Sequence, residues 1–155
     1  LKHKALFAAL YVNELLVRLI HKQESDLEVF SLYAGTLNNL ALSSEIEPVL
    51  RNFELNLLEL LGYGIDFSVV EKSSEKEKLT RWYYFHYETG FEQVDEVNSK
   101  TEKYFSNHTL QQIAEKKFTT LETQKSAKRL LRAALSSHLG DKPLSSRSLF
   151  RKNIG

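Results

Sequence analysis

A stretch between residues 45 and 67, EIEPVLRNFELNLLELLGYGIDF, constrains the fold of this chain most strongly. Its apolar residues recur at the three- and four-residue spacing of a helix, and Gly62 and Gly64 then provide residues that can adopt the positive φ of a helix end. One apolar stripe suits a core, and Leu55 and Leu58 form a second stripe beside Arg51. A helix with two apolar stripes contacts two neighbours, so the chain is expected to fold as a helical bundle.

The rest of the chain adds further helical segments and one segment typical of β structure. Helical spacing of apolar residues also marks residues 2–20, 27–42, 107–116 and 119–139. The aromatic run RWYYFHYETGFEQV predicts a hairpin at about 82–94. These elements predict a mainly α protein, a bundle of about five helices with a small β-hairpin insertion, in one domain over residues 1–155.

Composition places the chain among ordinary globular proteins. It has 155 residues, 42% hydrophobic and 26% charged, and no apolar run approaches the roughly 20 residues of a membrane span. We expect a cytoplasmic protein without a membrane segment. Because the chain begins with Leu1 inside a helical pattern, we also expect it to be part of a longer protein.

The residues offer no catalytic constellation. The five histidines are scattered without a metal-binding pair, there is no cysteine, and the six glycines form no phosphate-binding cluster. Glu88 and Asp95 could meet across the hairpin, but carboxylates near a turn are usually solvated. The sequence therefore predicts a protein that is not an enzyme, with no metal site and no cofactor.

Charge is distributed unevenly along the chain. The net charge is +1, yet residues 125–152 hold eight Lys or Arg against a single Asp. The cations at 125, 128, 129 and 132 share one side of a helix and could follow phosphates, or could simply form a solvated outer face. The same two interpretations apply to the cluster that follows, Lys142, Arg147, Arg151 and Lys152.

The hairpin aromatics divide between two faces. One face must anchor the hairpin, because two strands alone are marginally stable, and the other could stack nucleic-acid bases. Alternation places Trp82, Tyr84 and His86 on one face, and Tyr83, Phe85 and Tyr87 on the other.

The second stripe of the 45–67 helix also allows two interpretations. Arg51 beside Leu55 and Leu58 could capture an acidic peptide that ends in a hydrophobic residue and a free carboxylate. Alternatively, the two leucines contact another helix and Arg51 pairs with Glu47 or Glu54.

Four passages together resemble the RecO family of bacterial recombination mediators. RNFELNLLELLGYG at 51–64 is similar to the family's R-x-F-E-L-x-L-L-x-x-L-G-Y motif, and LFAALYVNELLVRL at 6–19 is similar to its first domain helix. YYFHYETGF at 83–91 resembles its hairpin. AKRLLRAALSSHLGDKPLSSRSLFR at 127–151 resembles its closing helix and tail.

The resemblance implies a helical domain that follows an N-terminal oligonucleotide-binding barrel, which is absent from this chain. It implies single-stranded DNA binding, annealing of complementary strands, and work with RecR to load RecA onto DNA. It also implies docking of the tail of the single-stranded-DNA-binding protein, with Arg51 as the carboxylate contact, Leu55 and Leu58 as groove wall, and Arg18 as a second cation. We expect phosphate contacts from six cations, Lys125, Lys128, Arg129, Arg132, Arg147 and Arg151.

One departure from the family pattern bears on metal binding. Many members resemble zinc-ribbon proteins after the G-Y motif, with four cysteines, whereas this chain has none between Phe67 and Tyr104. The hairpin is therefore expected to depend on aromatic packing. The alternative function is a protein-interaction module whose basic end binds acidic partner segments and not DNA.

Overall fold

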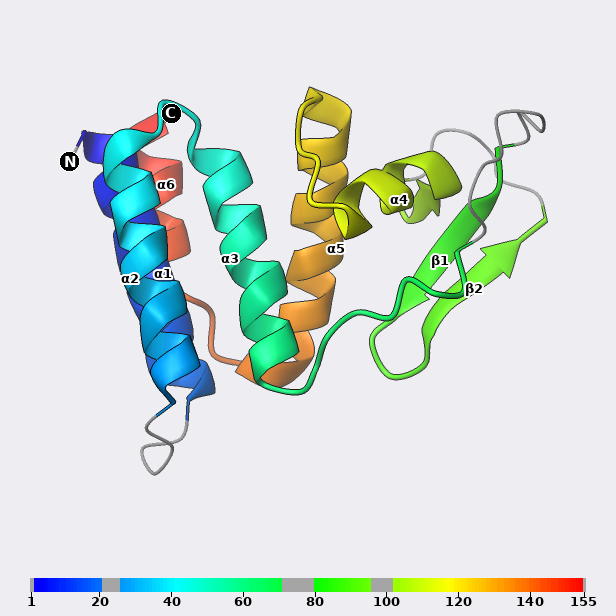
Figure 1. Cartoon of the computed structure of the whole chain (residues 1–155), viewed down its shortest axis with the longest axis horizontal. Helices are drawn as coiled ribbons and strands as arrows, with labels where there is room; N and C mark the ends of the chain where they lie inside the picture. Colours follow the sequence, from blue (N-terminus) through cyan, green and yellow to red (C-terminus); the bar gives the residue numbers. More distant parts are fainter. Residues whose placement is uncertain (1, 21–25, 71–79, 96–101, 155) are drawn as a thin grey trace. The chain divides into compact units, whose positions relative to one another are not determined.

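The computed structural model describes residues 2–20, 26–70, 80–95 and 102–154. Six helices and three strands form in these residues (Figure 1). In chain order they are α1 His3–Leu19, α2 Leu27–Leu42, α3 Ile46–Leu60, β1 Trp82–His86, β2 Gly90–Val94, β3 Tyr104–Ser106, α4 Asn107–Ala114, α5 Leu121–Leu139 and α6 Ser145–Ile154. The predicted mainly α fold with a small hairpin is confirmed, and the structure adds a sixth helix and a third strand.

Backbone contacts divide the chain into two compact units. The first unit comprises residues 1–64 and 135–155, and the second comprises residues 65–134. The α5 helix therefore contributes its residues up to Ala134 to the second unit and the remainder to the first. The expected single domain contains two units, with the second inserted in the sequence of the first.

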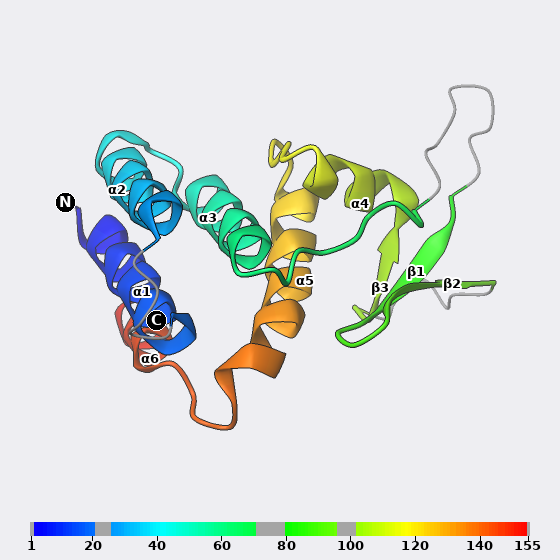
Figure 2. The same ribbon diagram turned by 60° about the horizontal axis from the view of Figure 1, so that its bottom comes forward.

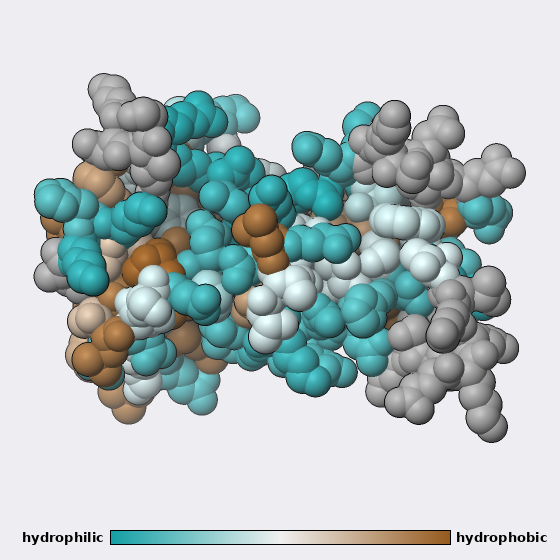
Figure 3. All heavy atoms as spheres, turned by 90° about the horizontal axis from the view of Figure 1, so that it is seen from above, coloured by the Kyte–Doolittle hydropathy of each residue, from teal (hydrophilic) through white to brown (hydrophobic). Residues whose placement is uncertain are grey.

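The first unit is helical. Its first helix, α1, packs on α2, α3 and α6, and α2 packs on α3 (Figure 1). Large residues fill its core, among them Leu15, Leu40, Phe53 and Leu57. Other apolar side chains of α1 and α2 reach the surface, including Val17 and Phe30, and Figure 3 shows brown apolar patches on this unit.

The α3 helix ends as its glycines predict. Gly62 has a φ of 83°, and the Tyr63 amide donates to the Leu58 carbonyl at 2.8 Å, which is the hydrogen bond of a Schellman cap. Gly64 is not in the left-handed region. Tyr63 then stacks on His138, with ring centroids 4.0 Å apart.

The second unit contains the sheet, with the strand order β2-β1-β3 (Figure 2). Both pairings are antiparallel, and Tyr83 of β1 lies opposite Phe105 of β3. Tyr83 is only 1% exposed and Phe105 is also buried, so these two side chains pack inward. Tyr87, which the alternation places on the same face as Tyr83, is 62% exposed. Base stacking by the opposite face stays a prediction.

Candidate functional site

A cleft of about 700 Å³ lies along α5 in the second unit. We call it the basic cleft, because four cations line it, Lys125, Lys128, Arg129 and Arg132. Two carboxylates, Glu102 and Glu122, line it as well. The four cations that the sequence marks on this helix therefore share one concave surface with a net positive charge.

The pattern of α5 explains why the cations point away from the core. The hydroxyl of Thr120 accepts a hydrogen bond from the Thr123 amide at 3.1 Å, which caps the start of the helix. Side chains on one side of the helix are buried, so positions three and four residues apart on the other side share the outer surface. The buried ones include Ala127, Leu130, Leu131 and Ala134.

Arg129 occupies a different environment from the other three cations. Its guanidinium carbon lies 4.6 Å from the centroid of the Phe105 ring, and its Nη2 lies 3.4 Å from the Ser126 hydroxyl. Burial lowers the pKa of Arg129, an effect that the nearby Glu102 opposes. Lys125, Lys128 and Arg132 are exposed. The cleft thus combines one partly desolvated cation with three solvated ones.

Arg147 and Arg151, also expected to contact phosphates, lie on α6 in the first unit. The structure does not place them among the residues that line the basic cleft. Arg151 is exposed. Arg147 is half-buried, and its positive charge favours the ionised form of Glu54.

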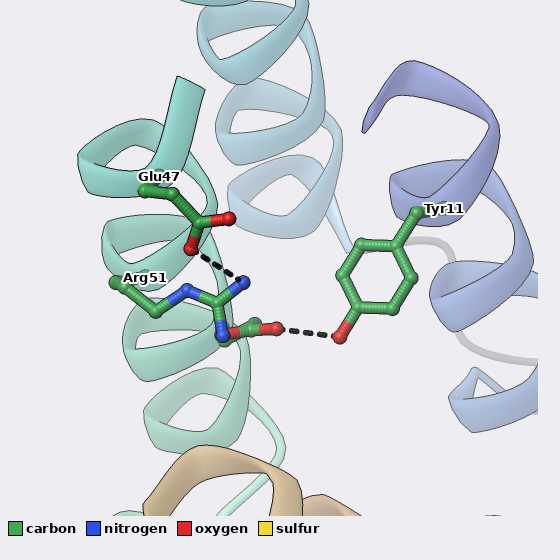
Figure 4. Close-up of polar contacts among 4 residues, drawn as sticks. Tyr11, Glu47 and Arg51 are labelled. Carbon is green, nitrogen blue, oxygen red and sulfur yellow. Dashed lines mark hydrogen bonds and ion pairs between the residues drawn. The ribbon is translucent and has the colours of Figure 1, made fainter. Parts of the chain in front are cut away.

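The first unit encloses a polar network at Arg51. Nη1 of Arg51 lies 3.0 Å from Oε2 of Glu54, and Nη2 lies 3.6 Å from Oε2 of Glu47. The Tyr11 hydroxyl of α1 donates to Oε1 of Glu54 at 2.5 Å (Figure 4). Burial raises the pKa of Glu54, and Arg51 and the Tyr11 hydrogen bond oppose that increase. The network joins α1 to α3 through the buried side chains of Tyr11, Glu54 and Arg51, whereas the Glu47 side chain is 42% exposed.

This burial corrects the expectation of an open peptide groove. Arg51 is 4% exposed, and Leu55 and Leu58 are buried with it. The physical reason is that α3 packs against both α1 and α2, so its second apolar stripe is covered by the chain's own helices. Of the two interpretations that the sequence left open, the arrangement corresponds to leucines in helix contacts and to ion pairs with Glu47 and Glu54.

Arg18, the expected second cation of the groove, contacts backbone carbonyls at the last residue of α5 and just after it. Its guanidinium donates to the carbonyl oxygens of Leu139 at 2.5 Å and Lys142 at 2.6 Å, close to the end of α5. One turn earlier on α1, the Glu14 carboxylate accepts from the amides of Ser145 at 2.6 Å and Ser146 at 2.8 Å. Two side chains of α1 therefore hold the link between α5 and α6 at both ends.

Replacing Glu14 with glutamine is expected to lower the free energy of unfolding at neutral pH by about 1 kcal/mol, because an amide has only one acceptor oxygen for these two donors. Burial acts to raise the pKa of Glu14, but hydrogen bonds from Ser146 and Ser145 outweigh it and lower the pKa overall. A lowered pKa in the folded state stabilises above the usual pKa of a glutamate, and this contribution is lost as the pH falls through the lowered value.

Urea unfolding of both proteins at pH 7 and at about pH 3 measures this effect, since the usual glutamate pKa is about 4.3. The difference between wild type and Glu14→Gln should shrink at the lower pH. Glu88→Gln is the control, because Glu88 is an exposed residue of the turn between β1 and β2. A Glu14→Gln variant as stable as Glu88→Gln at pH 7 would contradict the capping role.

Sequence reasoning missed several residues of the basic cleft. Glu122 and Ser126 could have been found, because each lies three residues from a basic position on the same helix, Glu122 from Lys125 and Ser126 from Arg129. Glu102 and Phe105 come from a separate segment that precedes α4, and no pattern within the sequence links them to α5. Only the tertiary fold brings them to Arg129.

The described part of the chain offers no group of three or more His, Asp or Glu side chains that could hold a metal ion. None of the helices in the described residues has the length and apolar character needed to cross a membrane.

Comparison with known proteins identifies the family. Residues 3–148 match the family model described as "Recombination protein O C terminal". The "DNA repair protein RecO" of Methylococcus capsulatus is 36% identical over 157 residues, covering 99% of this chain and 62% of that protein. The proteins of the same name from Pectobacterium atrosepticum and Aliivibrio fischeri are 41% and 40% identical, and the matches cover 96% and 94% of this chain. The chain spans 60% of the length of each of these two relatives. With a match over nearly its whole length, the chain belongs to the RecO family, in the region of the family's C-terminal part.

Proposed function

We propose that this chain acts in DNA repair and recombination by binding single-stranded DNA along the basic cleft. The observation that carries the proposal is the convergence of Lys125, Lys128, Arg129 and Arg132 on one concave surface. Cations that neutralise phosphates release condensed counterions, which drives binding to nucleic acid. The names of the relatives, which are DNA repair proteins, support the same proposal.

The dimensions of the cleft suit a flexible polyanion. From position 125 to position 132 the helix advances about 10 Å, enough for the cations to meet more than one phosphate of a strand. Leu121 also lines the cleft and is 66% exposed, so it offers an apolar surface to a sugar or a base. A single strand can bend its backbone along this surface and turn a base toward Leu121.

The wider activity follows from the family resemblance. In this proposal the chain is not an enzyme; it supports annealing of complementary strands and, together with RecR, the loading of RecA onto DNA in the bacterial cytoplasm. The tail of the single-stranded-DNA-binding protein is a further proposed partner. Arg51, Leu55 and Leu58 are buried, so binding of the tail at these residues would require α3 to become accessible.

A protein-interaction module is the second candidate function. The same cations could bind an acidic partner segment, and the exposed Leu121 could receive a hydrophobic side chain of that segment. This function predicts no dependence of DNA affinity on oligonucleotide length. The DNA proposal predicts affinity that rises with length until the cleft is filled.

The test is a titration of a labelled single-stranded oligonucleotide at several salt concentrations. Changing Lys125, Lys128, Arg129 and Arg132 together to alanine should weaken binding and reduce the slope of log K against log salt by up to about 3, since each phosphate contact on a single strand contributes about 0.7. Lys4→Ala serves as the comparison, because it removes an exposed cation of α1 that does not line the cleft and that was not expected to contact phosphates. An unchanged slope in the quadruple variant would exclude the cleft as the DNA site.

A further inference from the structure

Arg129 is the one cation of the basic cleft whose guanidinium rests on an aromatic ring in the described residues. The other three cations, Lys125, Lys128 and Arg132, have exposed side chains. Among these, the exposed Lys125 must be ordered when it binds, which costs conformational entropy. Arg129 is already ordered by its surroundings, so the four cations are not equivalent.

The ring beneath Arg129 is itself held in place. Phe105 is a buried residue of β3, and its backbone pairs with that of Tyr83 on β1. Tyr83 in turn contacts Phe91 of β2 edge to face, with ring centroids 6.4 Å apart. All three strands of the sheet therefore support the surface on which the guanidinium lies.

The guanidinium retains unused hydrogen-bonding capacity. Its Nη1 is buried, and no group in the described part of the chain accepts a hydrogen bond from it. Its Nη2 makes a single long contact to the Ser126 hydroxyl at 3.4 Å. Burial without a hydrogen-bonded anion is unfavourable for a cation, and the lowered pKa of Arg129 has this burial as its main cause.

An anion in the cleft would compensate for this burial. A cation that has already lost part of its hydration gains more from an opposite charge than a solvated cation does, because the surroundings screen the attraction less. The planar guanidinium can also donate two parallel hydrogen bonds to a phosphate, which a lysine ammonium cannot. Both properties favour a phosphate at Arg129 over one at the exposed lysines.

We propose that Arg129 is the fixed anchor of the nucleic-acid site and binds one phosphodiester group of a single strand through the edge of its guanidinium that faces the cleft, with the Phe105 ring supporting the group. Lys125, Lys128 and Arg132 then attract the neighbouring phosphates by their charge alone. This inference rests on the proposed function and deepens it. It assigns shape recognition of a phosphate to one residue of the cleft and general electrostatic attraction to the others.

One carboxylate of the cleft, Glu102, acts on Arg129. The negative charge of Glu102 favours the charged form of Arg129, so a phosphate that binds there must approach a carboxylate as well. Removing that carboxylate should make phosphate binding easier. Glu102→Gln is therefore expected to raise oligonucleotide affinity by a few-fold, about the effect of one partly screened charge.

The deciding experiment compares Arg129→Lys with Lys125→Ala, using a labelled oligothymidylate and the full chain at several salt concentrations. Arg129→Lys keeps the charge but loses the planar guanidinium and its contact with the Phe105 ring. Affinity should therefore fall about tenfold while the salt slope stays unchanged. Lys125→Ala should reduce the slope by about 0.7. Phe105→Leu, which keeps an apolar residue under the guanidinium but removes the ring, should weaken binding in the same direction as Arg129→Lys.

The outcomes separate this inference from the proposed function. If Arg129→Lys binds within twofold of the wild type while Lys125→Ala has a smaller slope of log K against log salt, Arg129 is not the anchor, and DNA binding by the cleft still holds. If the wild type binds no oligonucleotide, both are wrong. Thermal melting checks the fold of each variant. If Arg129→Lys does not fold, the oligonucleotide affinity of Glu102→Gln tests the proposal in its place. An affinity equal to that of the wild type would then overturn the anchoring role of Arg129.

Discussion

Replacing Glu54 with alanine is expected to lower the free energy of unfolding by about 3–5 kcal/mol, the usual result of removing one partner from a buried ion pair. Glu54 is 1% exposed and holds both the Arg51 guanidinium and the Tyr11 hydroxyl. Without it, Arg51 remains buried and charged, with only the more distant Glu47 to balance it. Urea unfolding at neutral pH, followed by far-ultraviolet circular dichroism, measures the loss.

Two further variants identify the cause. Tyr11→Phe removes only the hydrogen bond to the carboxylate, so it should cost less, about 1.5–3 kcal/mol. The double variant Arg51→Met with Glu54→Leu removes both charges and retains apolar volume, so it should be more stable than Glu54→Ala alone. A double variant less stable than the single one would show that packing, and not the unpaired charge, causes the loss.

Replacing Leu58 with alanine is expected to cost about 2–5 kcal/mol, the range for deleting a large buried aliphatic side chain. Leu58 is 1% exposed, on a helix covered by both α1 and α2. The alanine leaves a cavity that these packed helices can fill only in part. The same urea unfolding experiment measures the cost.

The matched control is Leu42→Ala, because Leu42 is 78% exposed at the end of α2 and its truncation removes little buried surface. That change should alter the free energy of unfolding by no more than about 0.5 kcal/mol. If Leu58→Ala were as mild as Leu42→Ala, Leu58 would behave as a surface residue. The groove that the sequence suggested would then have to be reconsidered.

The helices of this chain could be predicted because their apolar spacing is a local property. The stretches that became α1, α2, α3 and α5 each carry enough turns to show the helical period. The third strand could not be found in this way, because Tyr104–Ser106 has three residues, too few for an alternation to be visible. Its identity as a strand depends on pairing with β1, which lies about twenty residues earlier.

The residues of the candidate site also differ in whether the local sequence could predict them. The four cations of the basic cleft lie on one helix, so their spacing predicts a shared surface. Phe105, which supports Arg129, comes from a strand and has no sequence relation to it. The second apolar stripe of α3 indicates a neighbour, but not whether that neighbour is a partner or another helix of the same chain. For Leu55 and Leu58 it is another helix of the same chain.

The contact between Glu14 of α1 and the start of α6 has a consequence for the order in which the chain can fold. It spans 131 residues, and the second unit lies entirely between its two ends. A ribosome delivers a chain from its N-terminus, so every residue of the second unit is made before Ser145. The inserted unit can therefore be complete while α1 still exposes the surface that α6 will cover. During synthesis that helical surface is therefore exposed until α6 has been made, and transiently exposed apolar surface favours aggregation.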